Sequence, residues 1–126
     1  MNQQLFCSIC VDTDAPAATT AAIVAEITGG VVTAGGVDCR WARIAVDDDY
    51  GDSDVRSEDP DDFLGWPTLL EVMPPDQADR QSVLDGVTSL MNALLQRGLR
   101  VLAKADYAEL LPGGGEVADP GTGARG

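Results

Sequence analysis

The chain has 126 residues, enough for one domain, and its 21 acidic and 8 basic residues give a net charge of −13 at pH 7. This charge excludes binding to a nucleic-acid backbone, which requires lysines and arginines to neutralise phosphates. Because the sequence contains no histidine, histidine metal ligands and Ser-His-Asp triads are excluded as well.

The N-terminal residues and the cysteine count indicate the compartment. The opening stretch MNQQLFCSICVDTD has no basic region and no long apolar run, so we expect no signal peptide. No window approaches the roughly 20 apolar residues of a membrane span. Three cysteines are an odd number and do not suggest a secreted disulfide framework. We therefore expect a cytoplasmic protein with reduced thiols and no membrane association.

The first elements in chain order are a strand and a helix. Residues 5–11 (LFCSICV) are apolar and too few for a helix, which predicts a buried strand. The next segment, 16–28, begins with a proline, which suits a first helical turn. Thr13 or Asp14 would cap this helix, and Gly29 would end it because glycine adopts left-handed backbone geometry readily.

The middle of the chain is extended and then acidic. Residues 31–34 and 37–46 have the composition of strands. Gly35-Gly36 between them forms either a two-residue hairpin turn or a glycine bulge in one long strand, and the sequence leaves both alternatives open. Residues 47–62 (DDDYGDSDVRSEDPDD) show no periodicity and are predicted to be an acidic loop.

The second half of the chain repeats the order strand, helix, strand. Residues 63–73 predict a strand that starts near Pro67, since proline is tolerated at the first residue of a strand. Residues 76–97 predict the main helix, with Asp76 as its cap, because their apolar residues recur every three or four positions on one face. Gly98 would end this helix, and residues 99–103 predict a last short strand.

This order of elements predicts an α+β fold of the ferredoxin-like, or split βαβ, kind. The expected architecture is a sandwich in which two helices lie on one face of an antiparallel sheet of four or five strands. Residues 1–112 would form this single α+β domain. Residues 113–126 are Gly-rich and are expected to be a disordered tail.

Cys7 and Cys10 form a CxxC pair, but their spacing on a strand argues against shared chemistry. Side chains on a strand alternate between faces, so residues three apart point to opposite sides of the sheet. The two sulfurs would then neither form a disulfide nor share a metal ion. We expect buried free thiols, no metal and no cofactor.

The acidic loop is the principal candidate site. It holds nine acidic residues and one arginine, a net charge of −8, whereas the other 110 residues have a net charge of −5. An EF-type calcium loop that begins at Asp47 would need glycine at its sixth position, where this sequence has an aspartate. The loop is therefore a recognition loop for a basic partner, a weak calcium-binding loop or a solvated loop. The residues that we assign to partner binding are Asp47, Asp48, Asp49, Asp52, Asp54, Glu58 and Asp59.

Two functions follow as hypotheses. The first is a small, non-enzymatic, cytoplasmic binding protein that masks a basic partner protein through the acidic loop, as immunity proteins and antitoxins do. The alternative is a small-molecule-binding or enzymatic ferredoxin-like protein that forms a homodimer through the uncovered face of its sheet. The pocket at that face would be lined by Trp41, Arg43, Trp66 and Glu71.

Overall fold

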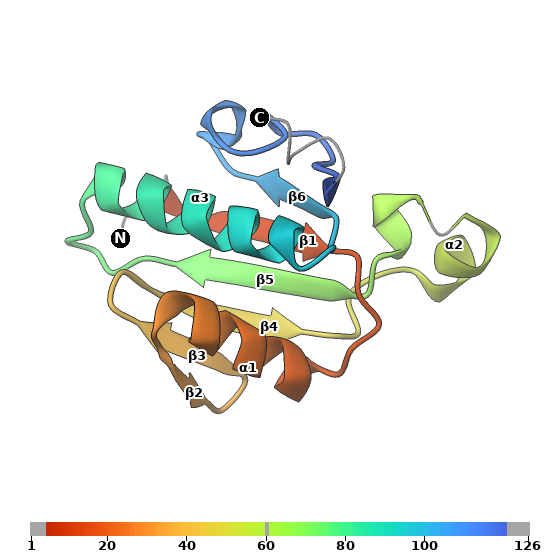
Figure 1. The fold of residues 1–126 in the computed structure, drawn as a ribbon, viewed down its shortest axis with the longest axis horizontal. Coiled ribbons are helices and arrows are strands. Elements are labelled where there is room, and N and C mark those ends of the chain that lie inside the picture. Colours follow the sequence, from red (N-terminus) through yellow and green to blue (C-terminus); the bar gives the residue numbers. More distant parts are fainter. Residues whose placement is uncertain (1–4, 60, 121–126) are drawn as a thin grey trace.

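A computed structural model describes residues 5–59 and 61–120, which form an α+β fold (Figure 1). The predicted class and the antiparallel sheet are confirmed. In this part of the chain the sheet has six strands, where four or five were predicted, and there are three helices, where two were predicted. The elements in chain order are β1 (Cys7–Val11), α1 (Ala17–Thr28), β2 (Val31–Thr33), β3 (Gly36–Cys39), β4 (Ala42–Asp47), α2 (Ser53–Glu58), β5 (Thr68–Met73), α3 (Arg80–Gln96) and β6 (Val101–Lys104).

The strands follow the order β2-β3-β4-β5-β1-β6, and every neighbouring pair is antiparallel. The long helices α1 and α3 lie side by side on one face of this sheet (Figure 1). The short helix α2 lies beyond one end of the strands, on the segment that connects β4 to β5 (Figure 1). The long helices therefore leave the opposite face of the sheet uncovered. The short helix α2 lies near one end of that face.

The difference in strand number arises at two hairpin turns. Ala34 and Gly35 form the turn between β2 and β3, with Gly35 at a φ of 76°. Of the two predicted alternatives, the structure therefore has the hairpin turn and not the glycine bulge. A second turn at Arg40 and Trp41 divides the predicted strand 37–46 into β3 and β4. Neither residue of this second turn is a glycine or proline, so composition alone did not indicate it.

The core lies between the helices and the sheet, with a smaller apolar cluster on the other face. Cys7, Ile9 and Val11 of β1 face the helices, where they join the buried residues of α1 and α3. Cys10 faces the other way and packs with Trp66, Leu69 and Leu102, which are all buried. The two sulfurs of the CxxC pair therefore lie on opposite faces, as the alternation of a strand predicted.

The helix ends differ from the predictions in their capping residues. Neither Thr13 nor Asp14 caps α1: the backbone N–H of Ala17 donates to Asp48, 2.7 Å away and 31 residues along the chain. For α3 the cap is Asp79, which accepts from the N–H of Ser82, so this helix begins at Arg80. The apolar face of α3 is buried as predicted: Val83, Val87, Leu90, Met91, Leu94 and Leu95.

The C-terminal segment contacts the sheet where the structure describes it. Within residues 113–126, Ala118 is 6 % exposed and exchanges two backbone hydrogen bonds with Val101 at the start of β6. Residues 121–126, also part of the expected disordered tail, lie outside the described residues. The division of the chain at residue 112 stays a prediction. In the described parts of the chain, no helix has the length and apolarity that a membrane crossing demands.

Candidate functional site: the acidic segment and its pocket

The acidic segment 47–62 is more regular than the sequence predicted, because it contains helix α2. Asp52 caps this helix by accepting hydrogen bonds from the N–H groups of Asp54 (2.9 Å) and Val55 (3.3 Å). Asp54 in the first turn and Arg56 in the last turn match the charges that the helix dipole favours. The prediction of an irregular loop was wrong here, since a capped single helical turn leaves no apolar periodicity to detect.

Four of the seven candidate carboxylates shape the backbone. Asp47 accepts from the N–H of Asp49, Asp48 from the start of α1, Asp52 from the start of α2, and Asp59 from the N–H of residue 61. These carboxylates fix turns and helix ends, so their contribution to binding is tied to local structure.

The other three carboxylates, those of Asp49, Asp54 and Glu58, are exposed. In the described parts of the chain, no hydrogen bond or ion pair involves the side chains of these three residues. All seven residues of the predicted set are exposed, and these three are the ones whose carboxylates are not engaged within the described residues.

Two arginines anchor the segment to the sheet through one aspartate. Arg56 of α2 reaches Asp12 at the end of β1, with 2.6 Å between nitrogen and oxygen. Arg100, just before β6, holds the other carboxylate oxygen of Asp12 with two nitrogens at 2.6 and 2.9 Å. Exposed carboxylates complete the network, since Asp14 pairs with Arg56 at 3.1 Å and Asp61 with Arg100 at 2.9 Å.

This network is largely shielded from solvent. The side chain of Asp12 is 16 % exposed and those of Arg56 and Arg100 are 23 % and 22 % exposed. Burial opposes the charged form of Arg56, but its hydrogen bonds to Asp12 and Asp14 outweigh burial and raise its pKa. Hydrogen bonds to Asp12 likewise raise the pKa of Arg100 against the effect of burial. The sequence analysis missed this network, although the single arginine among nine acids was a signal for it.

Close backbone packing also holds the segment in place. The N–H of Tyr50 donates to the carbonyl of Pro67, and that of Asp52 to the carbonyl of Leu64, both at 2.9 Å. A Cβ atom on Gly51 would overlap the carbonyl of Trp66. The indole of Trp66 is fully buried, and the guanidinium of Arg100 lies 5.3 Å from the centre of its ring.

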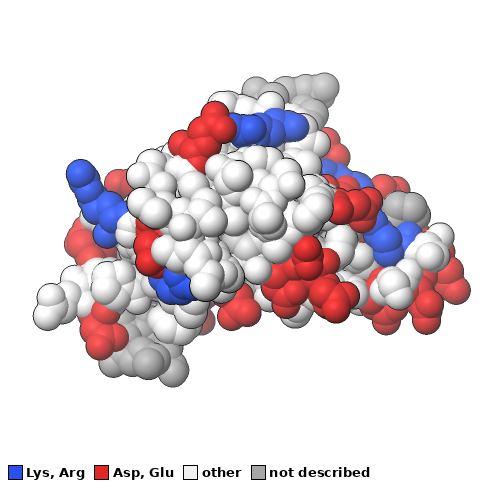
Figure 2. All heavy atoms as spheres, turned by 90° about the horizontal axis from the view of Figure 1, so that it is seen from below, with Lys and Arg blue, Asp and Glu red and all other residues white. Residues whose placement is uncertain are grey.

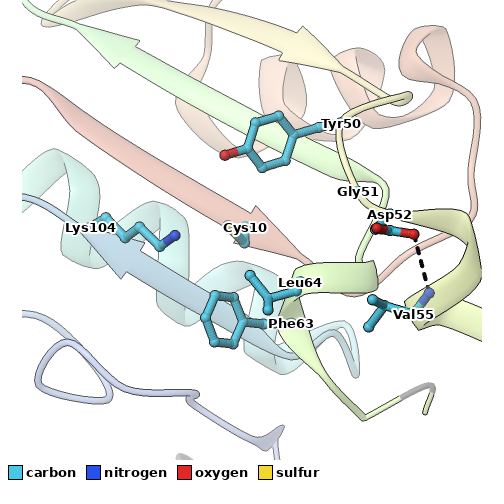
Figure 3. A pocket seen from close by; sticks show the side chains of 8 residues that line it. All are labelled: Cys10, Tyr50, Gly51, Asp52, Val55, Phe63, Leu64 and Lys104. Atoms are coloured by element: carbon cyan, nitrogen blue, oxygen red, sulfur yellow. Dashed lines mark hydrogen bonds between the residues drawn. The ribbon is translucent and has the colours of Figure 1, made fainter. Parts of the chain in front are cut away.

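A pocket of about 530 Å³ lies between this segment and the uncovered face of the sheet (Figure 3). Figure 3 shows Tyr50 from one side and Lys104 of β6 from the other, with Cys10 between them at the sheet. The lining residues are Cys10, Tyr50, Gly51, Asp52, Val55, Phe63, Leu64 and Lys104.

The pocket combines exposed apolar groups with charges of both signs. Tyr50 and Leu64 are 53 % and 56 % exposed, so the pocket presents two large apolar side chains to solvent. The amine of Lys104 lies 5.0 Å from the ring centre of Phe63. Burial raises the pKa of the Cys10 thiol while Lys104 lowers it, and the net effect is upward, so this thiol is not an activated nucleophile.

The structure brings two of the four residues assigned to the alternative pocket near each other: Arg43 and Glu71 are diagonal neighbours on the paired strands β4 and β5. Trp41 packs on the helix side, where a Cβ atom on Gly86 of α3 would overlap its indole. Arg43 and Glu71 lie on the uncovered face, since their strand neighbours face the helices. Arg43 is engaged with Asp38 at 2.9 Å and with the turn at Ala34, while the indole of Trp66 is buried in the second cluster.

In residues 5–59 and 61–120, no three Cys, Asp or Glu side chains gather in a way that could hold a metal ion. Comparisons with protein-family models, with curated proteins and with solved structures found no match to this chain.

Proposed function

We propose that this chain is an acidic binding protein that masks a basic partner protein, the class of function performed by immunity proteins and antitoxins. The outward carboxylates of Asp49, Asp54 and Glu58 would meet basic groups of the partner. The exposed side chains of Tyr50 and Leu64 beside them would supply apolar contacts. The observation that carries the proposal is the anchoring of the acidic segment by Arg56 and Arg100 through Asp12.

The anchoring bears on function because it holds like charges together. Residues 47–62 have a net charge of −8, and clustered like charges repel one another in the folded state. The two shielded arginines hold the segment in place against that repulsion. Fixed carboxylates lose less conformational entropy on binding, and a local negative field accelerates the capture of a positively charged partner.

Parallel affinity capture tests this proposal. The bait is the parent chain or a variant with Asp49→Asn, Asp54→Asn and Glu58→Gln, which keeps every capping carboxylate. Asp85 of α3 and Glu109 on the turn after β6 lie outside the segment, so Asp85→Asn with Glu109→Gln controls for the loss of two acidic charges elsewhere. We expect a basic protein to be retained by the parent and the control but not by the variant.

Kinetics with the captured protein complete this test. Its association rate with the parent should fall steeply between low salt and about 0.5 M salt, where charges are screened within a few ångströms. With the variant the rate should be slower and its dependence on salt weaker. Equal rates for parent and variant would contradict the proposal.

A small-molecule site is the second candidate function, and the pocket beneath Tyr50 is the observation that favours it. Its volume of about 530 Å³ falls within the range of roughly 300–1,000 Å³ that is common for ligand sites. Lys104 would attract an anionic group, and Tyr50 and Phe63 would contact a ring. A co-purifying ligand whose release follows Lys104→Ala would favour this candidate over the masking of a partner.

We further propose that the fold is a ferredoxin-like variant. The order β4-β5-β1-β6, with α1 and α3 as the connecting helices, matches that pattern, and the β2–β3 hairpin would be an insertion. This fold serves many functions and therefore adds nothing to the functional argument. A cytoplasmic location is proposed from the three free thiols.

A further inference from the structure

The two edges of the sheet differ in how they are protected. At the β6 edge, Val101 pairs with Ala118 of the C-terminal segment, and Lys104 adds a charge. At the other edge, β2 pairs only with β3 in the sheet order. Proteins commonly blunt such edges by keeping the strand short or with charges, prolines or covering segments; β2, with the sequence Val31-Val32-Thr33, is short, and none of its residues is charged or a proline.

The backbone of Val32 points away from the sheet. The two-residue turn at Ala34 and Gly35 makes Thr33 and Gly36 the hydrogen-bonded pair that closes the hairpin. Hydrogen-bonded and non-bonded pairs alternate along an antiparallel ladder. Val32 and Val37 therefore form a non-bonded pair, and the N–H and C=O of Val32 are directed outward.

The surface around this edge is apolar in an otherwise acidic molecule. Val31 is 66 % exposed and Val32 is 51 % exposed. A groove of about 220 Å³ lies beside Val32, between β2 and the start of α1, and no charged residue lines it. Figure 2 views the molecule from the β2 side and shows a broad uncharged area, with acidic side chains gathered toward the α2 end.

We propose that a second copy of this chain docks on this edge, with the two β2 strands antiparallel and Val32 opposite its counterpart. The N–H and C=O of each Val32 would then exchange two hydrogen bonds across a twofold axis, joining the two sheets into one. Each Val32 side chain would lie at the groove between β2 and α1. The surface is self-complementary, as a twofold interface requires.

Charge favours a second copy at this position over one on the uncovered sheet face. The uncovered face presents Glu71 and Lys104, which would be desolvated there. A twofold axis at β2 instead directs the two α2 ends away from each other, since α2 lies beyond one end of the strands (Figure 1). The most negative parts of two chains, each with a net charge of −13, are thus kept apart.

Sedimentation of the full chain over about 10 µM to 1 mM tests the inference, since short interfaces give weak dimers. We expect a mass that rises toward twice 13.2 kDa with concentration. Added salt should strengthen this dimer because it screens the repulsion between acidic copies. Salt should weaken capture of a basic partner, so the two proposals fail independently.

Two variants and one matched control locate the interface. Val32→Lys places like charges directly opposite each other and should raise the dissociation constant roughly tenfold or more. Val32→Pro removes the outward N–H, and prolines are tolerated at such edge positions. Leu110→Lys makes the same charge change at a side chain that is 58 % exposed, on the turn after β6, and should leave the dimer intact.

Hydrogen exchange gives a second readout, since the amide of Val32 should be protected in concentrated samples and lose protection on dilution. A parent chain that stays monomeric throughout the concentration range overturns the inference. So does a dimer that survives both Val32 variants, or one that Leu110→Lys weakens equally. If Val32→Pro does not fold, Val32→Lys alone decides, because its side chain is half exposed.

Discussion

Replacing Asp12 with asparagine should release the acidic segment from the sheet. The carboxylate of Asp12 accepts three hydrogen bonds from two arginines, at 2.6, 2.6 and 2.9 Å. A hydrogen bond to a charged group contributes about 1.5–3 kcal/mol, but bonds that share one acceptor do not add fully. Because both arginines keep an exposed carboxylate partner, we expect a loss of about 2–4 kcal/mol in the free energy of unfolding, below the upper range for broken buried pairs.

Asp14→Asn is the matched control for this prediction. Asp14 makes one contact with Arg56, at 3.1 Å, and its side chain is 76 % exposed. Exposed ion pairs contribute about 0–1 kcal/mol, so this change should be nearly neutral. Both substitutions are isosteric and remove one negative charge, so their difference isolates the shielded network.

Urea denaturation measures the two free energies, and hydrogen exchange shows where the loss occurs. In Asp12→Asn, the amides of α2 should exchange faster than those of α3, because the anchor of α2 is lost while the main core is unchanged. Equal stability losses for the two variants, or unchanged protection of α2, would refute the anchoring role of Asp12.

Three further predictions concern the core. In urea denaturation, Leu94→Ala should lower the free energy of unfolding by about 2–5 kcal/mol, because this side chain is buried. Ser89 is exposed, so Ser89→Ala should lower it by less than about 0.5 kcal/mol. Equal losses would contradict the assigned face of α3. Gly86→Ala should lower the free energy of unfolding by about 1–3 kcal/mol, because the new methyl group would displace the indole of Trp41. The fluorescence of Trp41 should change as well, and an unchanged spectrum would argue against this contact. Burial raises the pKa of the Cys7 thiol from near 9 to about 12, so the unfolded chain loses this proton first as pH rises. The free energy of unfolding should therefore fall by up to about 1.4 kcal/mol per pH unit between about pH 9 and 12. Cys7→Ala should reduce this slope. An equal slope in the parent and in Cys7→Ala would show that the thiol is exposed.

Short-range patterns carried the correct part of the sequence analysis. The three- and four-residue spacing of apolar side chains identified the buried face of α3, and Gly98 marked its end with a φ of 87°. The alternation of β1 placed Cys7 and Cys10 on opposite faces. These features depend on residues within a few positions of one another, which a local pattern records directly.

The candidate site was located by composition but not described by it. The concentration of acids identified segment 47–62, and all seven assigned acidic residues are exposed. The pocket beside it also requires Lys104 and Cys10, which belong to β6 and β1. No spacing within the segment could indicate residues that the sheet brings to it.

By itself, the sequence determined the α+β class, the main helix, the strand that carries two cysteines and the position of the strongest charge. The tertiary structure alone decided which groups hold that charge in place. Asp48 caps a helix 31 residues before it, Arg56 pairs with an aspartate 44 residues away, and Arg100 reaches the same aspartate across 88 residues. Hydrogen bonds and ion pairs act between groups that folding brings within about 3 Å, and separations of this length along the chain leave no periodic trace in the sequence.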